Sequence, residues 1–253
     1  MIIDTPKLSD IPALRVLWQE SFGDSDEFLD LFFSTAFDTA RSRCITVDRT
    51  IVAALYWLDC SFEEKRIAYI YAVATAKAYR GRGLCSALME DTHRHAASLG
   101  YKGVILVPGS SELFRFYKKL GYTTCCYVSE FNCAASEAKT ELRQLNADEY
   151  ARLRRVFLPK NGVVQENENI KFLQTQAAFY AGGGFLLAAR CEKDTLYGVE
   201  LLGDTEAAPF IVRTLGCAKG CFRAPGTDKP FAMYHALSEG SLSPPAYFGW
   251  AFD

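Results

Sequence analysis

Apolar residues recur along the first third of the chain with two spacings, one typical of helices and one typical of strands. Every third or fourth position is apolar in residues 11–22 and again in 25–37, which predicts two amphipathic helices. Ser9 precedes the first helix and is expected to cap it. Three strands are predicted next. The third, apolar on both faces in its second half, is expected in the centre of a sheet. These strands cover residues 43–48, 50–59 and 65–75.

The pattern then alternates between helices and strands. A helix is predicted from Gly83 to Leu99, where Gly100 ends it, and a second helix ends at Gly121. Strands are predicted at residues 103–108 and 122–133. Alternation of this kind favours an α/β sheet domain, which we place at residues 1–134.

A small, polar segment at residues 135–141 is the predicted linker to a second domain at residues 142–253. That domain begins with helical patterns near residues 146–158 and 166–180. Strand-like runs and one short helix follow, at residues 184–192, 195–203, 205–216, 221–226 and 231–237.

The second half of the chain repeats a short string of the first. Lys-Gly, four strand residues and Pro-Gly occur at residues 102–109 and again at 219–226, each time after a helix that ends in Leu-Gly. The repetition predicts a diverged internal duplication. An unrelated α+β domain with an accidental echo is the alternative.

Composition restricts the function classes. The 253 residues are 49% apolar and 23% charged with a formal net charge of −2, which is typical of a globular protein and argues against nucleic-acid binding through bulk positive charge. The chain start does not resemble a signal peptide, and no run reaches the roughly 18 apolar residues of a membrane span. We therefore expect a cytoplasmic location and no membrane partner. The nine cysteines show no paired spacing, so free thiols and no metal site are expected.

The segment Tyr79–Met89 alternates arginines with glycines just before a predicted helix. Gly81 and Gly83 let the backbone approach a ligand, and the start of a helix offers unpaired N–H groups. With Arg80 and Arg82 beside them, these features predict a cradle for a pyrophosphate. A tight turn with solvated arginines is the alternative. Two other phosphate loops are excluded, because neither Gly-Lys-Ser/Thr nor a full Gly-x-Gly-x-x-Gly occurs here.

This segment resembles the acetyl-CoA loop of the GNAT superfamily of N-acetyltransferases. The family pattern is Gln/Arg-x-x-Gly-x-Gly/Ala, and residues 80–85 match it except that Cys85 replaces the last small residue. Val73–Thr75 lie where the family pairs a strand with the pantetheine arm, and Tyr117 with Gly121-Tyr122 resembles its Tyr-x-x-x-Gly-Phe. The resemblance covers residues 1 to about 134. The wider pattern resembles the enhanced intracellular survival branch, which carries a second, inert GNAT-like domain.

The resemblance implies a fold, a co-substrate and a set of binding residues. The fold is the GNAT acyl-CoA acyltransferase fold, an α/β fold with a mixed, mostly antiparallel sheet. A second, shortened GNAT-like α/β domain without the CoA loop follows it. The co-substrate is acetyl-CoA. The residues expected to bind it are Val73, Ala74, Thr75, Arg80, Gly81, Arg82, Gly83, Leu84, Cys85, Ser86 and Ser110.

The implied chemistry is direct transfer of an acetyl group to an amine. Tyr117 is expected to protonate the leaving CoA thiolate, since a phenol with a pKa of about 10 stays protonated at neutral pH. A backbone N–H around Val73–Thr75 is expected to meet the oxyanion. The base stays open between a water relay and one of four acidic residues of the first two helices, Glu20, Asp24, Asp26 and Glu27.

Several alternatives stay open. The acceptor is a small-molecule, peptide or protein amine, and the oligomeric state is open. The main rival to an N-acetyltransferase is a non-catalytic acyl-CoA-binding sensor or scaffold, and a weaker one is an aminoacyl transferase built from paired GNAT domains.

His93 and His95, two apart on a helix, face different ways and are interpreted as surface residues. Four aromatic residues could line an acceptor pocket, but packing in the core is the preferred interpretation of each: Trp57, Tyr56, Phe22 and Phe28.

Overall fold

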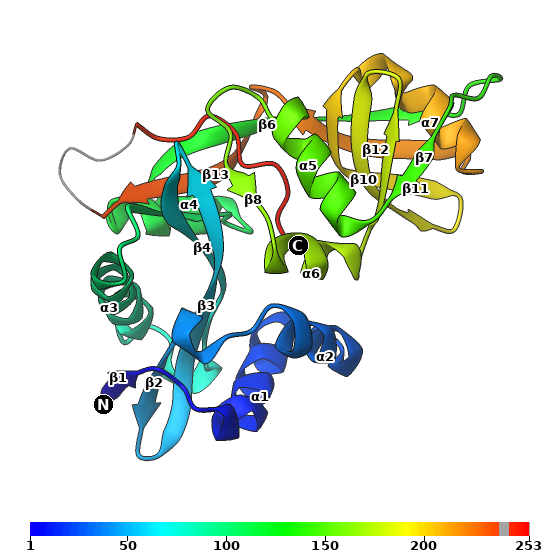
Figure 1. The fold of residues 1–253 in the computed structure, drawn as a ribbon. Helices are drawn as coiled ribbons and strands as arrows, with labels where there is room; N and C mark the ends of the chain where they lie inside the picture. The colour runs from blue at the N-terminus through cyan, green and yellow to red at the C-terminus, as the bar shows by residue number, and fades with distance from the viewer. Residues whose placement is uncertain (238–242, 253) are drawn as a thin grey trace. The chain divides into compact units, whose positions relative to one another are not determined.

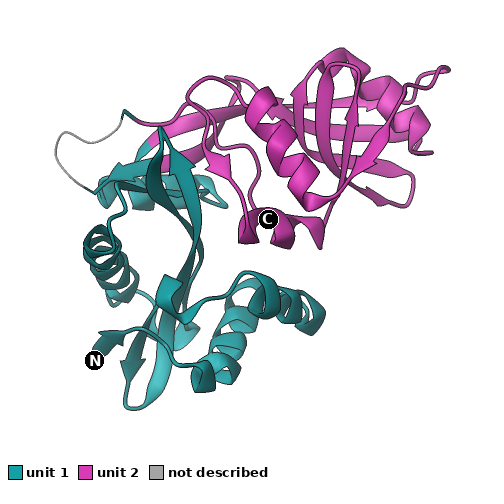
Figure 2. Ribbon diagram, viewed as in Figure 1, with its two compact units in different colours: residues 1–123, 234–243 teal, residues 124–233, 244–253 magenta. Residues whose placement is uncertain are grey.

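The computed structural model describes residues 1–237 and 243–252. The chain forms two compact units, which Figure 2 distinguishes by colour. Unit 1 consists of residues 1–123 and 234–243, and unit 2 consists of residues 124–233 and 244–253.

These units divide the chain differently from the linear domains expected from the sequence. Residues 124–134, expected to end the first domain, belong to unit 2. Residues 234–243, from the second half of the chain, belong to unit 1. The expected linker at residues 135–141 has no helix or strand and lies within unit 2. Each unit is therefore completed by a segment from the other half of the chain.

Unit 1 contains one sheet with helices on it, and Figure 1 labels its elements. The sheet order is β1-β2-β3-β4-β5, antiparallel except between β4 and β5. The end of β13 (Lys229–Ala236) lies beside β5, where the Leu237 N–H donates to the Lys102 carbonyl at 3.1 Å. The elements are β1 (Ile2–Asp4), α1 (Ile11–Phe22), α2 (Asp26–Thr35), β2 (Ser42–Val47), β3 (Thr50–Phe62), β4 (Lys65–Thr75), α3 (Leu84–Ser98), β5 (Gly103–Leu106) and α4 (Ser111–Lys119), with short 3-10 helices η1 (Leu8–Asp10), η2 (Thr39–Arg41) and η3 (Lys77–Tyr79).

The centre of this sheet is its most apolar part. β3 is buried without a break from Val52 to Leu58, and β4 is buried from Ile67 to Ile70. α1 packs on these two strands and buries Trp18, Leu14 and Leu17. Burial of one such side chain stabilises the fold by roughly 1.5–3 kcal/mol. The prediction that residues 65–75 form a central strand is confirmed.

The strands of unit 2 follow the order β6-β12-β11-β10-β9-β7. Their ladders are antiparallel except the one between β11 and β12. The elements are β6 (Thr123–Ala134), β7 (Arg143–Leu145), α5 (Ala147–Phe157), β8 (Val164–Gln165), α6 (Glu168–Gln174), β9 (Ala178–Gly182), β10 (Phe185–Glu192), β11 (Thr195–Gly203), η4 (Thr205–Ala207), α7 (Ala208–Thr214), β12 (Lys219–Pro225) and the first residues of β13.

Unit 2 repeats the succession of elements found in unit 1. An antiparallel hairpin, a helix and a strand parallel to the hairpin's second strand occur as β3-β4-α3-β5 and again as β10-β11-α7-β12. Each hairpin ladder also contains a register shift. In unit 2 the chain passes from β12 to β13 without a helix in the place of α4. The fold is thus two α/β units with mixed, mostly antiparallel sheets, the second one shortened.

Two predicted details are wrong. Ser9 does not cap α1, because it lies in η1, and α1 begins after Asp10 with Pro12 in its first turn. The helical pattern at residues 166–180 breaks after α6, because residues 178–182 pair with β10 as strand β9. There the ladder outweighs the local helical spacing.

Candidate active site

Strand β4 contains an irregularity before its last residues. The ladder with β3 shifts register next to Ala72, which has a positive φ of 50°. The parallel ladder with β5 pairs residues Ile67–Tyr69 with Gly103–Ile105 and ends before this β-bulge. A bulge bends its strand and re-aims the residues beside it. Val73–Thr75 therefore lie where β4 parts from β5, which is the place expected for a strand that pairs with a ligand.

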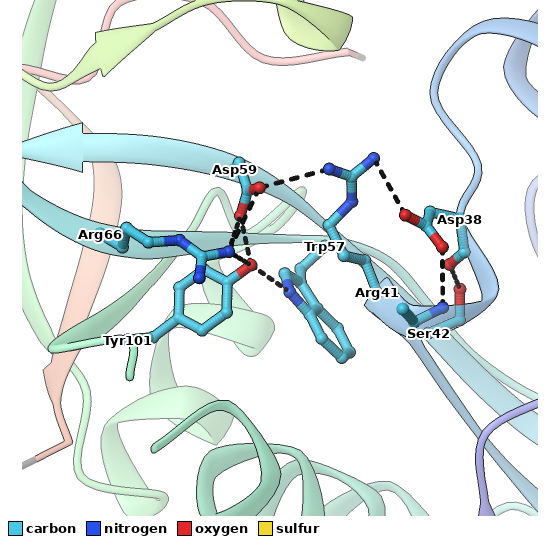
Figure 3. Close-up of polar contacts among 8 residues, drawn as sticks. Asp38, Arg41, Ser42, Trp57, Asp59, Arg66 and Tyr101 are labelled. Atoms are coloured by element: carbon cyan, nitrogen blue, oxygen red, sulfur yellow. Dashed lines mark hydrogen bonds and ion pairs between the residues drawn. The ribbon is translucent and has the colours of Figure 1, made fainter. Parts of the chain in front are cut away.

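Polar side chains join β4 to the start of β5 at the opposite end (Figure 3). Asp59 on β3 accepts hydrogen bonds from the Tyr101 hydroxyl and, at 3.2 Å, from Arg66 on β4. Arg66 Nη2 and Trp57 Nε1 both donate to the Tyr101 oxygen, at 2.9 and 3.2 Å. Burial, with the bond to Asp59, raises the pKa of Tyr101 to about 12. The Lys102 N–H donates to the Arg66 carbonyl at 2.9 Å, so the strands are fixed here and part only at the bulge.

The two arginines of the loop brace its backbone. Arg80 Nε donates to the Thr75 carbonyl at 2.9 Å, and Arg82 Nη2 donates to the Ala78 carbonyl at 2.9 Å. The Arg82 guanidinium also lies over the Tyr79 ring, 5.0 Å from its centroid. A guanidinium carries five N–H donors, so both exposed side chains keep donors for an anion after these contacts.

The glycines of the loop leave open space at the start of α3. Gly81 and Gly83 have φ values of 72° and 76°, a region that favours glycine. A Cβ on either glycine would meet nothing within 4 Å. Gly83 is the N-cap of α3 and brings no capping side chain. The N–H groups of Leu84, Cys85 and Ser86 therefore stand at an uncapped, electropositive helix start, an arrangement that fits the pyrophosphate of CoA.

Tyr117 and Cys85 both keep their protons at neutral pH. Tyr117 lies on α4 with 6% of its surface exposed. Burial, and secondarily Cys85, raise the pKa of Tyr117 above its usual value. Burial raises the pKa of the Cys85 thiol to about 11. A buried phenol of this kind can donate a proton, whereas a thiol held protonated is a poor nucleophile.

Ser110 is the N-cap of α4. Its Oγ accepts a hydrogen bond from the Leu113 N–H at 3.4 Å. The Ser110 side chain also hydrogen-bonds to Glu112 and helps to lower the pKa of that carboxyl, so donation to a ligand would replace this exposed bond. The side chain is exposed, which is compatible with the expected contact to CoA.

The four acidic residues considered as base lie in different surroundings. Glu20 Oε1 accepts from the backbone N–H of Lys77, in the turn that follows β4, at 3.3 Å. Side chains hold the other three elsewhere: Asp24 is bonded to Trp18, Asp26 is paired with Arg15, and a bond to Ser25 lowers the pKa of Glu27. Glu20 therefore contacts the segment that follows the bulged strand.

Aromatic side chains of α1 and β4 meet beside the bulge. The Trp18 ring packs against Phe22 and Tyr71, with centroids 5.7 and 5.5 Å apart. Tyr71 immediately precedes the bulge residue Ala72, and Phe22 is 48% exposed. Tyr56 and Trp57 are buried, as a core interpretation requires. Tyr71 was missed, because nothing in the sequence marks the position of the bulge.

The interpretation of His93 as a surface residue is wrong. Its Nε2 lies 2.7 Å from the Tyr122 hydroxyl, and the side chain is half-buried. Burial is the main cause that lowers the pKa of His93 to about 4. The helical pattern of α3 predicted the position of His93 on the helix. It did not show that an aromatic partner from another segment packs on this side chain.

Among residues 1–237 and 243–252, no helix is long and apolar enough to cross a membrane. In the same residues, no group of three or more His, Cys, Asp and Glu side chains is placed to hold a metal ion.

Comparison with known proteins identifies what the first unit resembles. Residues 3–125 match a family model described as an acetyltransferase (GNAT) domain. No curated protein sequence matches the chain.

Solved structures share the fold along nearly the whole chain. A GCN5-related N-acetyltransferase from Anabaena variabilis superposes with a TM-score of 0.74 at 15% identity, covering 94% of this chain and 73% of that one. One from Kribbella flavida gives 0.71 at 16% identity, with coverages of 93% and 70%. Eis1 from Mycobacterium abscessus gives 0.69 at 9% identity, with coverages of 94% and 74%. At these identities the likeness is one of fold.

Proposed function

We propose that this chain is an acetyl-CoA-dependent N-acetyltransferase, on the basis of the GNAT acetyltransferase domain that residues 3–125 match. The observation that carries the proposal is the uncapped start of α3, with two open glycines, beside the bulged end of β4. A helix start of this kind binds phosphates, and a strand edge that has left its neighbour can pair with an extended amide chain.

Each group of binding residues then contacts a different part of acetyl-CoA. The N–H groups of residues 81–86 and the guanidinium groups of Arg80 and Arg82 hold the pyrophosphate. The backbone edge of Val73–Thr75 pairs with the pantetheine amides, and Ser110 donates its hydroxyl hydrogen to the same arm. With the phosphates and the arm fixed, the thioester is directed toward the bulge and Tyr117.

The transfer step uses a backbone donor and the phenol. The amine nitrogen, once it has lost a proton, forms a bond to the thioester carbon, and the carbonyl oxygen becomes an oxyanion that the Val73 N–H stabilises. The C–S bond then breaks, and the thiolate takes the proton of Tyr117. The new amide nitrogen releases its second proton to solvent, from which Tyr117 regains one. The protonated state of Cys85 supports direct transfer rather than transfer through an acyl-cysteine.

Glu20 is the acidic residue best placed to receive the amine proton, directly or through water, because it contacts the turn after β4. The aromatic cluster of Trp18, Phe22 and Tyr71 lies beside the same strand. The acceptor is a small-molecule, peptide or protein amine, and the exposed ring of Phe22 favours one with an apolar part next to its nitrogen.

The test is an assay of thioester loss from acetyl-CoA with a panel of amines. We expect consumption that depends on the amine, with acetylated product and free CoA formed in equal amounts. A protein that binds CoA in calorimetry but consumes no thioester with any amine would instead be a non-catalytic acyl-CoA-binding module.

A further inference from the structure

Four rings pack against one another, from α3, α4, the turn after α4 and the end of β13. The Tyr122 ring meets Tyr117 edge to face, with centroids 5.7 Å apart and planes at 63°. The Tyr122 hydroxyl lies 2.7 Å from His93 Nε2 on α3. The His93 ring stacks on His235 near the end of β13, with centroids 4.5 Å apart and planes at 17°. All four residues belong to unit 1.

The backbone ties the same residues together. The Tyr122 N–H donates to the Tyr117 carbonyl at 3.1 Å, so the turn that ends α4 joins the two tyrosines directly. His235 Nδ1 lies 3.1 Å from the Gly121 carbonyl in this turn. Gly121 has a φ of 85°, and a Cβ there would stand 3.0 Å from His235 Nδ1. The histidine is therefore seated against a turn that only glycine fits well.

These contacts define the protonation of the cluster. A carbonyl can only accept, so His235 Nδ1 carries a hydrogen. Burial, then the neighbouring His235 and Arg94, lower the pKa of His93 to about 4, so its imidazole is neutral at neutral pH. A neutral imidazole and a phenol share one hydrogen between Nε2 and the oxygen. The pair of His93 and Tyr122 therefore buries no charge beside Tyr117.

We propose that His93, Tyr122 and His235 are positioning residues that hold the phenol of Tyr117 in one orientation for proton transfer. The proposal rests on the proposed function, in which Tyr117 is the general acid. His235 comes from the second half of the chain and reaches this cluster because the end of β13 belongs to unit 1. The second half of the chain thereby serves the chemistry of unit 1 without supplying a catalytic group.

The first test separates turnover from binding. Tyr122→Phe keeps the ring and removes only the hydroxyl bonded to His93. We expect kcat to fall about tenfold, since small misplacements of a catalytic group are costly, and KM for acetyl-CoA to stay within about twofold. His93→Gln retains a hydrogen-bonding group for Tyr122 and should lose less than His93→Leu. His95→Gln, two positions along α3, is the matched control and should leave kcat unchanged.

A double-variant cycle tests whether the cluster acts through Tyr117. In a Tyr117→Phe background, Tyr122→Phe should cause no further loss of kcat. Losses that multiply in the double variant would show an independent effect and overturn the inference. If Tyr117→Phe alone leaves kcat unchanged, the acid role and the positioning role both fall.

Imidazole NMR supplies a readout that needs no acceptor. The chain has three histidines, so each ring can be assigned by single substitutions. We expect His93 in the wild type to titrate at about 4, and its nitrogen signals, but not those of His95, to shift in Tyr122→Phe. A His93 that titrates near its ordinary value in the wild-type protein would overturn the inference and leave the proposed function standing.

Discussion

The two units carry the same succession of hairpin, helix and parallel strand, but their helix starts differ. α3 begins at Gly83 with no cap and open space beside it. Before α7, Asp204 Oδ1 already accepts from the Glu206 N–H at 3.0 Å, and Pro209 removes another N–H from the first turn. A Cβ on Gly203 would stand 2.2 Å from the Gly184 carbonyl oxygen. Asp204 thus caps η4, the turn that leads directly into α7, and places a carboxylate there, whereas α3 offers an anion donors. Ala207, the N-cap of α7 itself, brings no capping side chain.

The hairpins also differ beside their bulges. Next to the register shift of β11 stands Glu200, which is fully buried. Arg154 Nε and Nη2 both donate to its carboxylate at 2.9 Å, and the Tyr150 hydroxyl donates at 2.6 Å. Arg154 Nη2 also donates to the Phe248 carbonyl at 3.1 Å, and a Cβ on Gly249 would stand 2.2 Å from Glu200. The segment around Gly249 therefore packs directly on the ion pair.

The comparison teaches that the order of elements does not carry the activity. In unit 1 the bulge and the helix start are left for a ligand, whereas in unit 2 a buried ion pair lies beside the bulge and a carboxylate stands at the turn before the helix. We expect unit 2 to bind no CoA and to contribute shape and the strand that brings His235 to unit 1.

Tyr117→Phe should lower kcat by about 10²–10⁴-fold with little change in CoA affinity, because it removes the proton for the leaving thiolate. Steady-state kinetics and calorimetry with CoA measure the two quantities. Tyr150→Phe is the matching removal of a buried hydroxyl in unit 2 and should leave kcat unchanged. Equal turnover of wild type and Tyr117→Phe, with chemistry limiting the rate, would remove the catalytic distinction between the units.

Arg154→Leu should lower the free energy of unfolding by about 3–5 kcal/mol, because Glu200 would be left buried without its partner. Chemical denaturation measures this change. Arg155→Leu alters the neighbouring, exposed arginine, whose pair with Glu166 contributes about 0–1 kcal/mol. Similar losses in the two variants would mean that the buried pair does not hold unit 2 together.

Gly83→Asp should weaken CoA binding by about a hundredfold, since a carboxylate at the helix start repels phosphate. Gly100→Asp is the control at the other end of α3, where the glycine also has a positive φ and open space. Calorimetry should show one site in the wild type and in Gly100→Asp. Undiminished binding in Gly83→Asp would place CoA elsewhere, with α7 the next site to test, and break the comparison.

The neutral imidazole of His93 makes the stability of unit 1 depend on pH. A folded-state pKa of about 4 lies below the unfolded value of about 6.5, so the unfolded chain takes up the proton first as pH falls. Its contribution to stability is complete above about pH 6.5 and is lost toward pH 4, by roughly 3 kcal/mol for a shift of this size. Thermal unfolding across this range should show a shallower slope for His93→Gln. Parallel curves for the two proteins would count against a buried, neutral His93.

Much of the local structure could be predicted from the sequence. The apolar run at residues 65–75 has the bounds of β4, and the patterns at 195–203 and 231–237 match β11 and most of β13. The loop at residues 80–83 and the missing helix after Pro225 were also readable, because glycine, proline and periodicity act on near neighbours. The role of each loop residue in binding stays a prediction.

The sequence by itself determined where helices and strands form and which half of the chain carries the open loop. Only the tertiary structure decided that β6 belongs to unit 2, that the end of β13 belongs to unit 1, and that Glu200 meets Arg154. It also decided that His235 stacks on His93. An apolar or polar pattern specifies which face of an element is buried, but not which distant element covers it. That choice depends on the packing of side chains far apart in the chain, and no local spacing encodes it.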